Sequence, residues 1–396
     1  MACVLRRLPI LDRVRLGVLV AGLACVATGL LPAGEAVADV ARIGPLLLFL
    51  TAIIVLAELT KEAQVFDVLA GRLAIVGRGR YAALFLLCVA FASFTTAFLN
   101  LDTTAVLLTP VMLALASRAR IAPLPLAMTT VWPANTASLL LPVSNLTNLL
   151  AMDRVGLSTV DFAARMWAPQ AAALAVTMAL LWVFYWRRGA RGEDRYVPPP
   201  AVPVADRVLF GVAAAACAVF IGAILAGVEI GVAAAVAAVP VVAAFAWRDR
   251  GKLAWSLIPW QLLAFVVGLF LIIPTLSRYG LDTVMRALIG DAAAAGAEYR
   301  AAAAGAGLSN LVGNLPAYYA GERVIAGPGH ERLLSLLIGT NVGAVITPWA
   351  SLATLLWFEW CRRREVRVPI GRFLLSGACL AVTGLAAAVA ALLLTA

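Results

Sequence analysis

Long apolar runs separated by short charged connections dominate this chain and constrain its fold more than any other feature. Only 13% of the 396 residues are charged, against about 25% in an average soluble protein, so the chain lacks the polar residues to cover a surface in water. About 20 apolar residues in a helix span a bilayer, and the length suits about ten such passages. We therefore expect an all-α, polytopic membrane protein, which excludes a secreted enzyme, a disordered scaffold and a nucleic-acid-binding protein.

The apolar runs define where membrane segments are expected. They occupy residues 16–33, 43–60, 81–99, 104–117, 123–150, 168–186, 208–226, 229–247, 257–277, 301–320, 333–358 and 372–395. The sequence has no Walker-type phosphate-binding motif, and its single histidine excludes a zinc-binding H-E-x-x-H motif. We therefore expect no enzymatic activity, no cofactor and no metal site.

The basic residues indicate how the chain is oriented. With the N-terminus in the cytoplasm, 23 of the 31 Lys and Arg residues fall in inner connections and 8 in outer ones. Basic residues concentrate in the cytoplasmic loops of membrane proteins. This asymmetry predicts a multi-pass protein of the inner (plasma) membrane with a cytoplasmic N-terminus, where Arg15 belongs to the N-terminal basic cluster.

The same charge count requires two re-entrant hairpins of opposite orientation. Basic residues on the inner side flank residues 81–117, so this segment must enter from the cytoplasm and return there. Arg300 and Arg323, on the outer side, flank residues 301–320 in the same way. If the first segment crossed the membrane twice instead, Asp102 would lie in the connection with nowhere suitable to face.

The order of elements is repeated in the two halves of the chain. Each hairpin is followed by a hydrophobic segment that polar residues break near its middle, at 123–150 and at 333–358. Each hairpin is also preceded by a mixed apolar and charged stretch, 61–80 or 279–300, that we expect to lie along the membrane surface. This order, repeated with opposite orientation, is typical of inverted-repeat secondary transporters.

A polar, proline-rich linker separates the two halves. We expect a first inverted repeat at 1–187, a cytoplasmic linker at 188–207 and a second inverted repeat at 208–396, which has one additional span at 208–226. Non-helical backbone at membrane depth must pack inside protein or face a wet cavity. The four breaks should therefore converge on one site, where helix N-termini favour anionic or lone-pair-bearing groups and free carbonyls favour cations.

Polar residues at the four breaks are the candidates for substrate binding. They are Asn100, Thr103 and Thr104; Ser144, Asn145, Thr147 and Asn148; Ser309, Asn310 and Asn314; and Thr340 and Asn341. Their alternative role is to satisfy backbone groups that each break leaves free, but the symmetric placement favours binding for the set. No Arg or Lys falls within a predicted break, which favours a neutral hydroxylated solute or weak acid over a di- or tricarboxylate.

Asp102 is the carboxylate that we expect near the membrane midplane. A charged group at that depth is costly, so its presence favours a functional role in proton coupling or in orienting the substrate. The alternative is a hairpin cap that accepts hydrogen bonds from the backbone N–H groups of Thr104 and Ala105.

Four segments resemble the arsenite/antimonite efflux permeases of the ion-transporter superfamily, which is related to Na⁺/H⁺ antiporters and dicarboxylate carriers. Residues 98–110, FLNLDTTAVLLTP, are similar to the first hairpin of these permeases, and residues 134–148, ANTASLLLPVSNLTN, to their first broken helix. Residues 314–317, NLPA, resemble their second hairpin. Residues 339–357 resemble the segment with the pattern G-x-x-x-G followed by T-P-x-x-S-L-A-T-L-L-W.

The resemblance implies a secondary active transporter that exports arsenite or antimonite by proton antiport, with an elevator-type motion within a homodimer. It leaves open whether an accessory ATPase takes part. The expected partners are the small inorganic solute, protons and the lipid bilayer, and not nucleic acid.

Two kinds of alternative stay open. Within the same superfamily, the chain could be a cation-coupled Na⁺/H⁺ or organic-anion (dicarboxylate) carrier. Outside it, a channel would give uncoupled flux and a receptor would bind without flux, whereas a carrier saturates and shows counter-flow.

Overall fold

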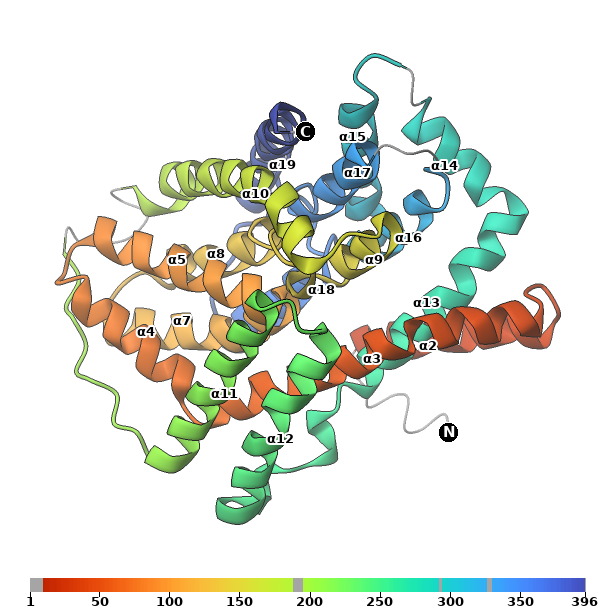
Figure 1. Cartoon of the computed structure of the whole chain (residues 1–396). Coiled ribbons are helices and arrows are strands. Elements are labelled where there is room, and N and C mark those ends of the chain that lie inside the picture. The colour runs from red at the N-terminus through yellow and green to blue at the C-terminus, as the bar shows by residue number, and fades with distance from the viewer. Residues whose placement is uncertain (1–9, 188–194, 292–293, 326–329, 396) are drawn as a thin grey trace.

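The structure of the chain is a computed structural model, shown in Figure 1. It describes residues 10–187, 195–291, 294–325 and 330–395. Within these ranges the regular structure is entirely helical, with no strand, which confirms the expected all-α class. The first part of the expected linker, 188–194, lies outside the described residues, and residues 195–206 form no helix.

Helices of the first half run up to the linker, and those of the second half follow it. The first set is α2 (Ile10–Ala27), α3 (Ala33–Glu62), α4 (Val65–Val76), α5 (Tyr81–Leu99), α6 (Leu101–Thr103), η1 (Thr104–Leu108), α7 (Thr109–Arg118), α8 (Pro123–Thr136), η2 (Pro142–Ser144), α9 (Leu146–Val155), α10 (Thr159–Leu181) and η3 (Trp182–Trp186). The second set is α11 (Arg207–Leu225), α12 (Ile230–Arg248), η4 (Arg250–Lys252), η5 (Trp255–Leu257), α13 (Trp260–Leu276), η6 (Ser277–Leu281), α14 (Asp282–Ile289), α15 (Ala297–Val312), α16 (Asn314–Glu322), α17 (Glu331–Val342), α18 (Leu352–Arg363) and α19 (Ile370–Leu394).

Eight helical segments within the described residues are long and apolar enough to cross a membrane. They are Ala33–Glu62, Tyr81–Leu99, Leu101–Arg118, Thr159–Trp186, Arg207–Ile224, Ile230–Arg248, Trp260–Ile289 and Ile370–Leu394. Large apolar side chains on these segments are exposed, such as Val236 (59%) and Val382 (69%). Extended exposed apolar surface marks contact with a membrane, so these faces are covered by lipid and the chain is a multi-pass membrane protein.

Two large clusters of buried apolar side chains form the core. One is built mainly from α3 to α5, α7, α8 and α10 to α12, and the other mainly from α13 to α17 and α19. The two parts meet where α10 packs along α19. Each cluster contains residues from both halves of the chain, so the two halves share their core.

Two tight turns shape the segments expected to be hairpins. The turn between α5 and α6 is at Asn100 (φ 78°, ψ 164°), and the turn between α15 and α16 is at Gly313 (φ 96°, ψ 155°). Positive φ is strained for most residues, while glycine adopts it freely and asparagine tolerates it. Both turns thus have the same backbone shape, and each is occupied by a residue type suited to it.

The two segments expected to be broken helices do contain non-helical backbone. Residues 137–141 and Asn145 separate α8 from α9 around the short η2 turn, and residues 343–351 separate α17 from α18. Because these stretches leave backbone groups free, surrounding side chains must satisfy them.

Packing crosses between the halves in a reciprocal pattern. Helix α9, after the first break, packs against α16 and α17, whereas α18, after the second break, packs against η1 and α8 (Figure 1). In the same way α2 packs against α13, and α12 against α3. This exchange brings both turns and both breaks to the middle of the molecule.

Candidate functional site

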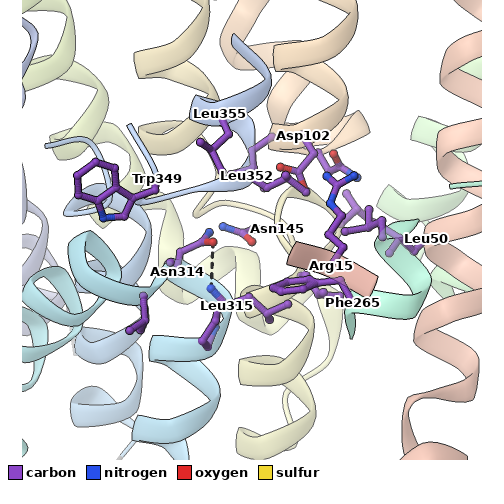
Figure 2. Close-up of a pocket in the computed structure, with 18 of the residues that line it drawn as sticks. Arg15, Leu50, Asp102, Asn145, Phe265, Asn314, Leu315, Trp349, Leu352 and Leu355 are labelled. Carbon is purple, nitrogen blue, oxygen red and sulfur yellow. Dashed lines mark hydrogen bonds between the residues drawn. The ribbon is translucent and has the colours of Figure 1, made fainter. Parts of the chain in front are cut away.

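A cavity of about 290 Å³ lies where the N-termini of four helical segments meet. The first of them is the continuous helix Leu101–Arg118, which joins α6, η1 and α7, and the others are α9, α16 and α18. The lining residues from these ends are Asn100, Leu101, Asp102, Asn145, Leu146, Gly313, Asn314, Leu315, Pro316, Trp349, Leu352 and Leu355. Figure 2 shows how Asp102, Asn145 and Asn314 are arranged around it.

Short polar side chains fix the helix ends at this cavity. The hydrogen bonds run from Thr103 N to Asn100 Oδ1 (2.8 Å), from Thr147 N to Asn145 Oδ1 (3.2 Å), from Leu315 N to Asn314 Oδ1 (2.9 Å) and from Thr354 N to Ser351 Oγ (3.1 Å). Such bonds satisfy N–H groups that have no partner inside a helix. The positive ends of four helix dipoles are therefore held around one small volume.

Asp102 connects the two halves at the cavity. Its carboxylate accepts a hydrogen bond from the backbone N–H of Ala353, at the start of α18. The other oxygen, Oδ1, is buried and has no hydrogen-bond partner among the described residues. The structure gives the capping role in the first hairpin to Asn100 instead. Asp102 is thus an anion at the N-terminus of a helix from the opposite half, a favourable position for negative charge.

Arg15 of α2 also lines this cavity. Its guanidinium points toward the carboxylate of Asp102 (Figure 2). The sequence places Arg15 in the N-terminal basic cluster and no Arg or Lys within a predicted break. The cation at the cavity comes from α2, outside the breaks. Helical spacing is the signal that could have found Arg15, since it shares one face of α2 with Leu19 and Gly22.

Asn145 contributes a hydrogen-bond donor to the cavity. Its side chain is 2% exposed, and its Nδ2 has no partner among the described residues. An unpaired buried donor is costly unless a ligand or water satisfies it. Together, Asp102 Oδ1 can accept and Asn145 Nδ2 can donate, so the site suits a solute whose groups do both.

A second, smaller cavity of about 160 Å³ adjoins the same carboxylate. Arg15, Asp102 and Thr103 line it, together with Glu58 of α3. Glu58 has its own cation, because Lys61 Nζ lies 3.2 Å from its Oε2. Asp102 and Arg15 thus face two neighbouring spaces.

Three predicted site residues form a buried network between the halves. Asn341 Nδ2 donates to Asn148 Oδ1 (2.8 Å), and Thr147 Oγ1 donates to Asn341 Oδ1 (2.9 Å). Asn148 Nδ2 in turn donates to two carbonyls of the first break, those of Ser138 and Leu141. None of the three lines the larger cavity, and their visible role is to join α9 to α17.

Asn310 supports the second break. Its Oδ1 accepts from the backbone N–H groups of Ile346 (3.1 Å) and Thr347 (2.9 Å), and its Nδ2 donates to the carbonyl of Gly343 (2.7 Å). One amide side chain therefore satisfies three free backbone groups.

The remaining predicted site residues bond to nearby carbonyls. The donors are Thr104 to Asn100 O (2.9 Å), Ser144 to Ala97 O (3.1 Å), Ser309 to Gly305 O (2.7 Å) and Thr340 to Leu337 O (3.0 Å). All four are buried and lie outside the cavity lining. The structure thus brings Asn100, Asp102, Asn145 and Asn314 to the larger cavity and places Thr103 at the smaller one.

Two further buried polar residues, Gln170 and Glu322, are not among the predicted site residues. Gln170 of α10 holds the first break, since its Oε1 accepts from Leu139 N (2.9 Å) and its Nε2 donates to Thr136 O (3.0 Å). In the sequence, the feature that could have indicated Gln170 is a polar amide side chain inside the otherwise apolar run 168–186. Glu322, at the end of α16, is 3% exposed, and its Oε2 has no partner among the described residues.

This arrangement defines a class of protein. A multi-pass helical bundle with interrupted helices whose ends meet at a central cavity is the architecture of a membrane transporter. The family model described as "Citrate transporter" matches residues 8–354. The chain therefore belongs to the citrate transporter family.

Individual relatives agree with this assignment. The chain is 27% identical over 364 residues to the arsenical pump membrane protein of Escherichia coli, covering 87% of this chain and 84% of the relative. Identity and coverage are the same for the protein of that name from Yersinia enterocolitica. These matches confirm the resemblance to arsenical permeases.

A solved structure has a similar fold. The YdaH transporter of Alcanivorax borkumensis superposes with a TM-score of 0.58 at 15% sequence identity, over 90% of this chain and 86% of that one. At this identity the likeness establishes the fold alone.

Proposed function

We propose that this chain is a secondary active transporter that exports arsenite or antimonite across the inner membrane in exchange for protons. The supporting observation is a single cavity lined by Asp102 and Asn145, whose buried Oδ1 and Nδ2 atoms have no hydrogen-bond partner among the described residues. Arsenite, As(OH)₃, carries three hydroxyl groups that each donate and accept. The site therefore matches a small hydroxylated solute, and the arsenical pump relatives favour this substrate.

Exchange follows from competition at one carboxylate. An ionised Asp102 accepts hydrogen bonds from solute hydroxyls through both oxygens, whereas a bound proton turns one oxygen into a donor and leaves the other a weaker, neutral acceptor. Solute and proton would therefore bind in turn and travel in opposite directions. Asp102 belongs to the first hairpin and contacts the start of α18. Binding of either a proton or the solute at Asp102 would therefore affect both halves of the chain.

The proposed motion moves the hairpins and broken helices together. Helices α5 to α9 and α15 to α18 contain the two turns and the two breaks, whereas α2, α3 and α11 to α13 pack mainly on one another and line one side of the cavity through α2, α3 and α13. We propose that the first group is the transport domain and the second the scaffold of a homodimer. The reciprocal packing supports two inverted repeats, 1–187 and 208–396, and the distribution of basic residues supports a cytoplasmic N-terminus.

An organic-anion carrier is the second candidate. The charge of Arg15 and the four helix N-termini at the cavity favour an anionic solute, and the family description names citrate. In this alternative, transport would be coupled to a cation such as Na⁺ instead of to proton exchange with arsenite.

Everted membrane vesicles test these proposals directly. A pH gradient, imposed in vesicles without any added ATPase, should drive saturable accumulation of arsenite but not of dicarboxylates or Na⁺. Asp102→Asn should reduce this uptake by about a hundredfold, the scale of a lost proton-transfer group. Asp249→Asn, an exposed carboxylate outside both cavities, is the matched control and should transport normally.

The outcomes separate the candidates. Dicarboxylate uptake without arsenite uptake would establish the organic-anion carrier. Proton-coupled arsenite uptake at the wild-type rate in Asp102→Asn would remove this residue from coupling. Uptake that appears only with an accessory ATPase would contradict proton antiport.

A further inference from the structure

One pair of opposite charges faces the central cavity. Among the described residues that line the larger cavity, the charged ones are Arg15 and Asp102, and both also line the smaller cavity. They come from separate parts of the fold, since Arg15 is on α2 and Asp102 follows the turn after α5. Figure 2 shows the guanidinium directed at the carboxylate.

The packing of α2 on α13 fixes where Arg15 lies. A Cβ on Gly268 would lie 2.6 Å from the Cα of Leu19, and a Cβ on Gly22 would lie 2.8 Å from the carbonyl oxygen of Gly268. The two backbones are therefore in direct contact. Arg15 lies four and seven residues before Leu19 and Gly22, on the same helix face, and Phe265 of α13 lines the cavity beside it. Arg15 is thus held at the cavity by a rigid helix pair.

Other charges near Asp102 already have partners. Glu58 of α3 lines the smaller cavity and is paired with Lys61. From α13 the lining residues are Leu262 and Phe265, and from α18 they are leucines. The cation that faces Asp102 from the helices around it is therefore Arg15.

We propose that Arg15 is a tethered counter-cation for Asp102, a specificity-determining residue that takes the place of a mobile metal cation in the cavity. A carboxylate buried in a membrane protein needs a nearby positive charge or a proton. Here a covalently attached guanidinium supplies the charge at the position where Na⁺ or K⁺ would otherwise bind. The cavity then repels a free cation, and transport needs neither ion. This assignment goes beyond the proposed function and holds whichever solute is carried.

Thermal unfolding of the purified protein tests the assignment without any solute. Wild type should have the same Tm in Na⁺, K⁺ and choline at equal ionic strength. In choline, Arg15→Ala should have a lower Tm than wild type. In Na⁺ or guanidinium the Tm of this variant should rise most of the way back to the wild-type value, because either ion can occupy the vacated position. In Arg15→Ala/Asp102→Asn this cation dependence should disappear. Arg42→Ala, which removes an arginine paired with Asp153 away from this cavity, is the matched control and should show no cation-specific effect.

Flux in proteoliposomes provides the second readout. Arg15→Ala should lose roughly tenfold or more of the wild-type flux in choline, as expected when one partner of a partly buried charge pair is removed, and should recover part of it in Na⁺. Arg15→Lys, which keeps the charge, should stay independent of Na⁺.

Several results would overturn the proposal. A wild-type Tm that rises specifically in Na⁺ contradicts a tethered cation, and so does an Arg15→Ala variant that is as stable as wild type in choline. If Arg15→Ala does not fold, the double variant should, because it removes both charges. Failure of the double variant would then assign Arg15 to packing alone. If wild-type arsenite flux is absent while the cation-dependent unfolding is observed, the proposed function fails and this inference stands.

Discussion

At the scale of single residues, buried asparagine side chains have two different roles in this protein. Within the described part of the chain, Asn145 Nδ2 has no partner at the cavity, whereas Asn148, Asn310 and Asn341 use their polar atoms in hydrogen bonds inside the protein. The difference follows from the surroundings, because a fully paired amide rigidifies a break and an unpaired one needs a ligand. Residue type alone does not distinguish the two.

The Asn148–Asn341 bond is expected to stabilise the contact between the halves. Asn341→Ala removes the donor to Asn148 Oδ1 and the acceptor of Thr147 Oγ1, leaving buried polar groups unpaired, at about 1–3 kcal/mol for each unsatisfied group. We expect a lower Tm in detergent with little change in substrate affinity. Thr383→Ala, which removes an exposed hydroxyl bonded within its own helix, is the control. A large loss of affinity with unchanged Tm would instead assign Asn341 to binding.

At the scale of helices, small residues allow α15 and α17 to pack unusually closely. A Cβ on Gly339 would lie 2.0 Å from the carbonyl oxygen of Ala302, and a Cβ on Gly343 would lie 2.3 Å from the Cβ of Ala306. Close backbone approach of this kind replaces the hydrophobic driving force that is missing between helices in lipid. The second hairpin is therefore locked against the helix that leads into the second break.

Gly339→Ala is expected to disrupt this helix pair. The added methyl group has no space, so the helices must separate, and overpacking of this kind typically destabilises by about 1–3 kcal/mol. Thermal unfolding should show the loss, and transport should fall with it because the break moves.

Gly307→Ala is the matched control on α15, because a Cβ there meets nothing within 4 Å. It should be neutral or slightly stabilising, since alanine favours a helix over glycine. If Gly339→Ala and Gly307→Ala changed the Tm and transport equally, close packing of α15 and α17 would not be the cause of the loss.

At the scale of the whole molecule, the proposed orientation predicts which connections face each side. The start of α10 should face outward and the turn between α18 and α19 should face the cytoplasm, because the basic residues concentrate at the latter. Val160 and Arg364 are exposed residues at these two places.

Cysteine labelling checks this orientation. In a variant without native cysteines, Val160→Cys should react with a membrane-impermeant maleimide in intact cells, and Arg364→Cys only after the membrane is opened. The reverse labelling pattern would show that the protein has the opposite orientation in the membrane. Labelling of both from one side would contradict the inverted repeats, since α19 and α10 would no longer run in opposite directions.

Sequence by itself determined the class of fold, most of the membrane segments and the positions of the turns and breaks. The reason is that hydrocarbon tolerates neither polar side chains nor free backbone groups, so the exceptions stand out in the sequence, as they do around Asn100 and Asn145. The family resemblance was also visible, because it is carried by contiguous motifs.

Tertiary structure alone decided which polar residues share the cavity. The direction in which a side chain points depends on contacts between segments far apart in the chain. Asp102 of the first half accepts a hydrogen bond from Ala353 of the second half. Arg15 reaches the cavity because Gly22 packs against Gly268. Such contacts arise from helix packing over about 250 residues of sequence separation, and no local pattern of hydrophobicity or charge encodes them.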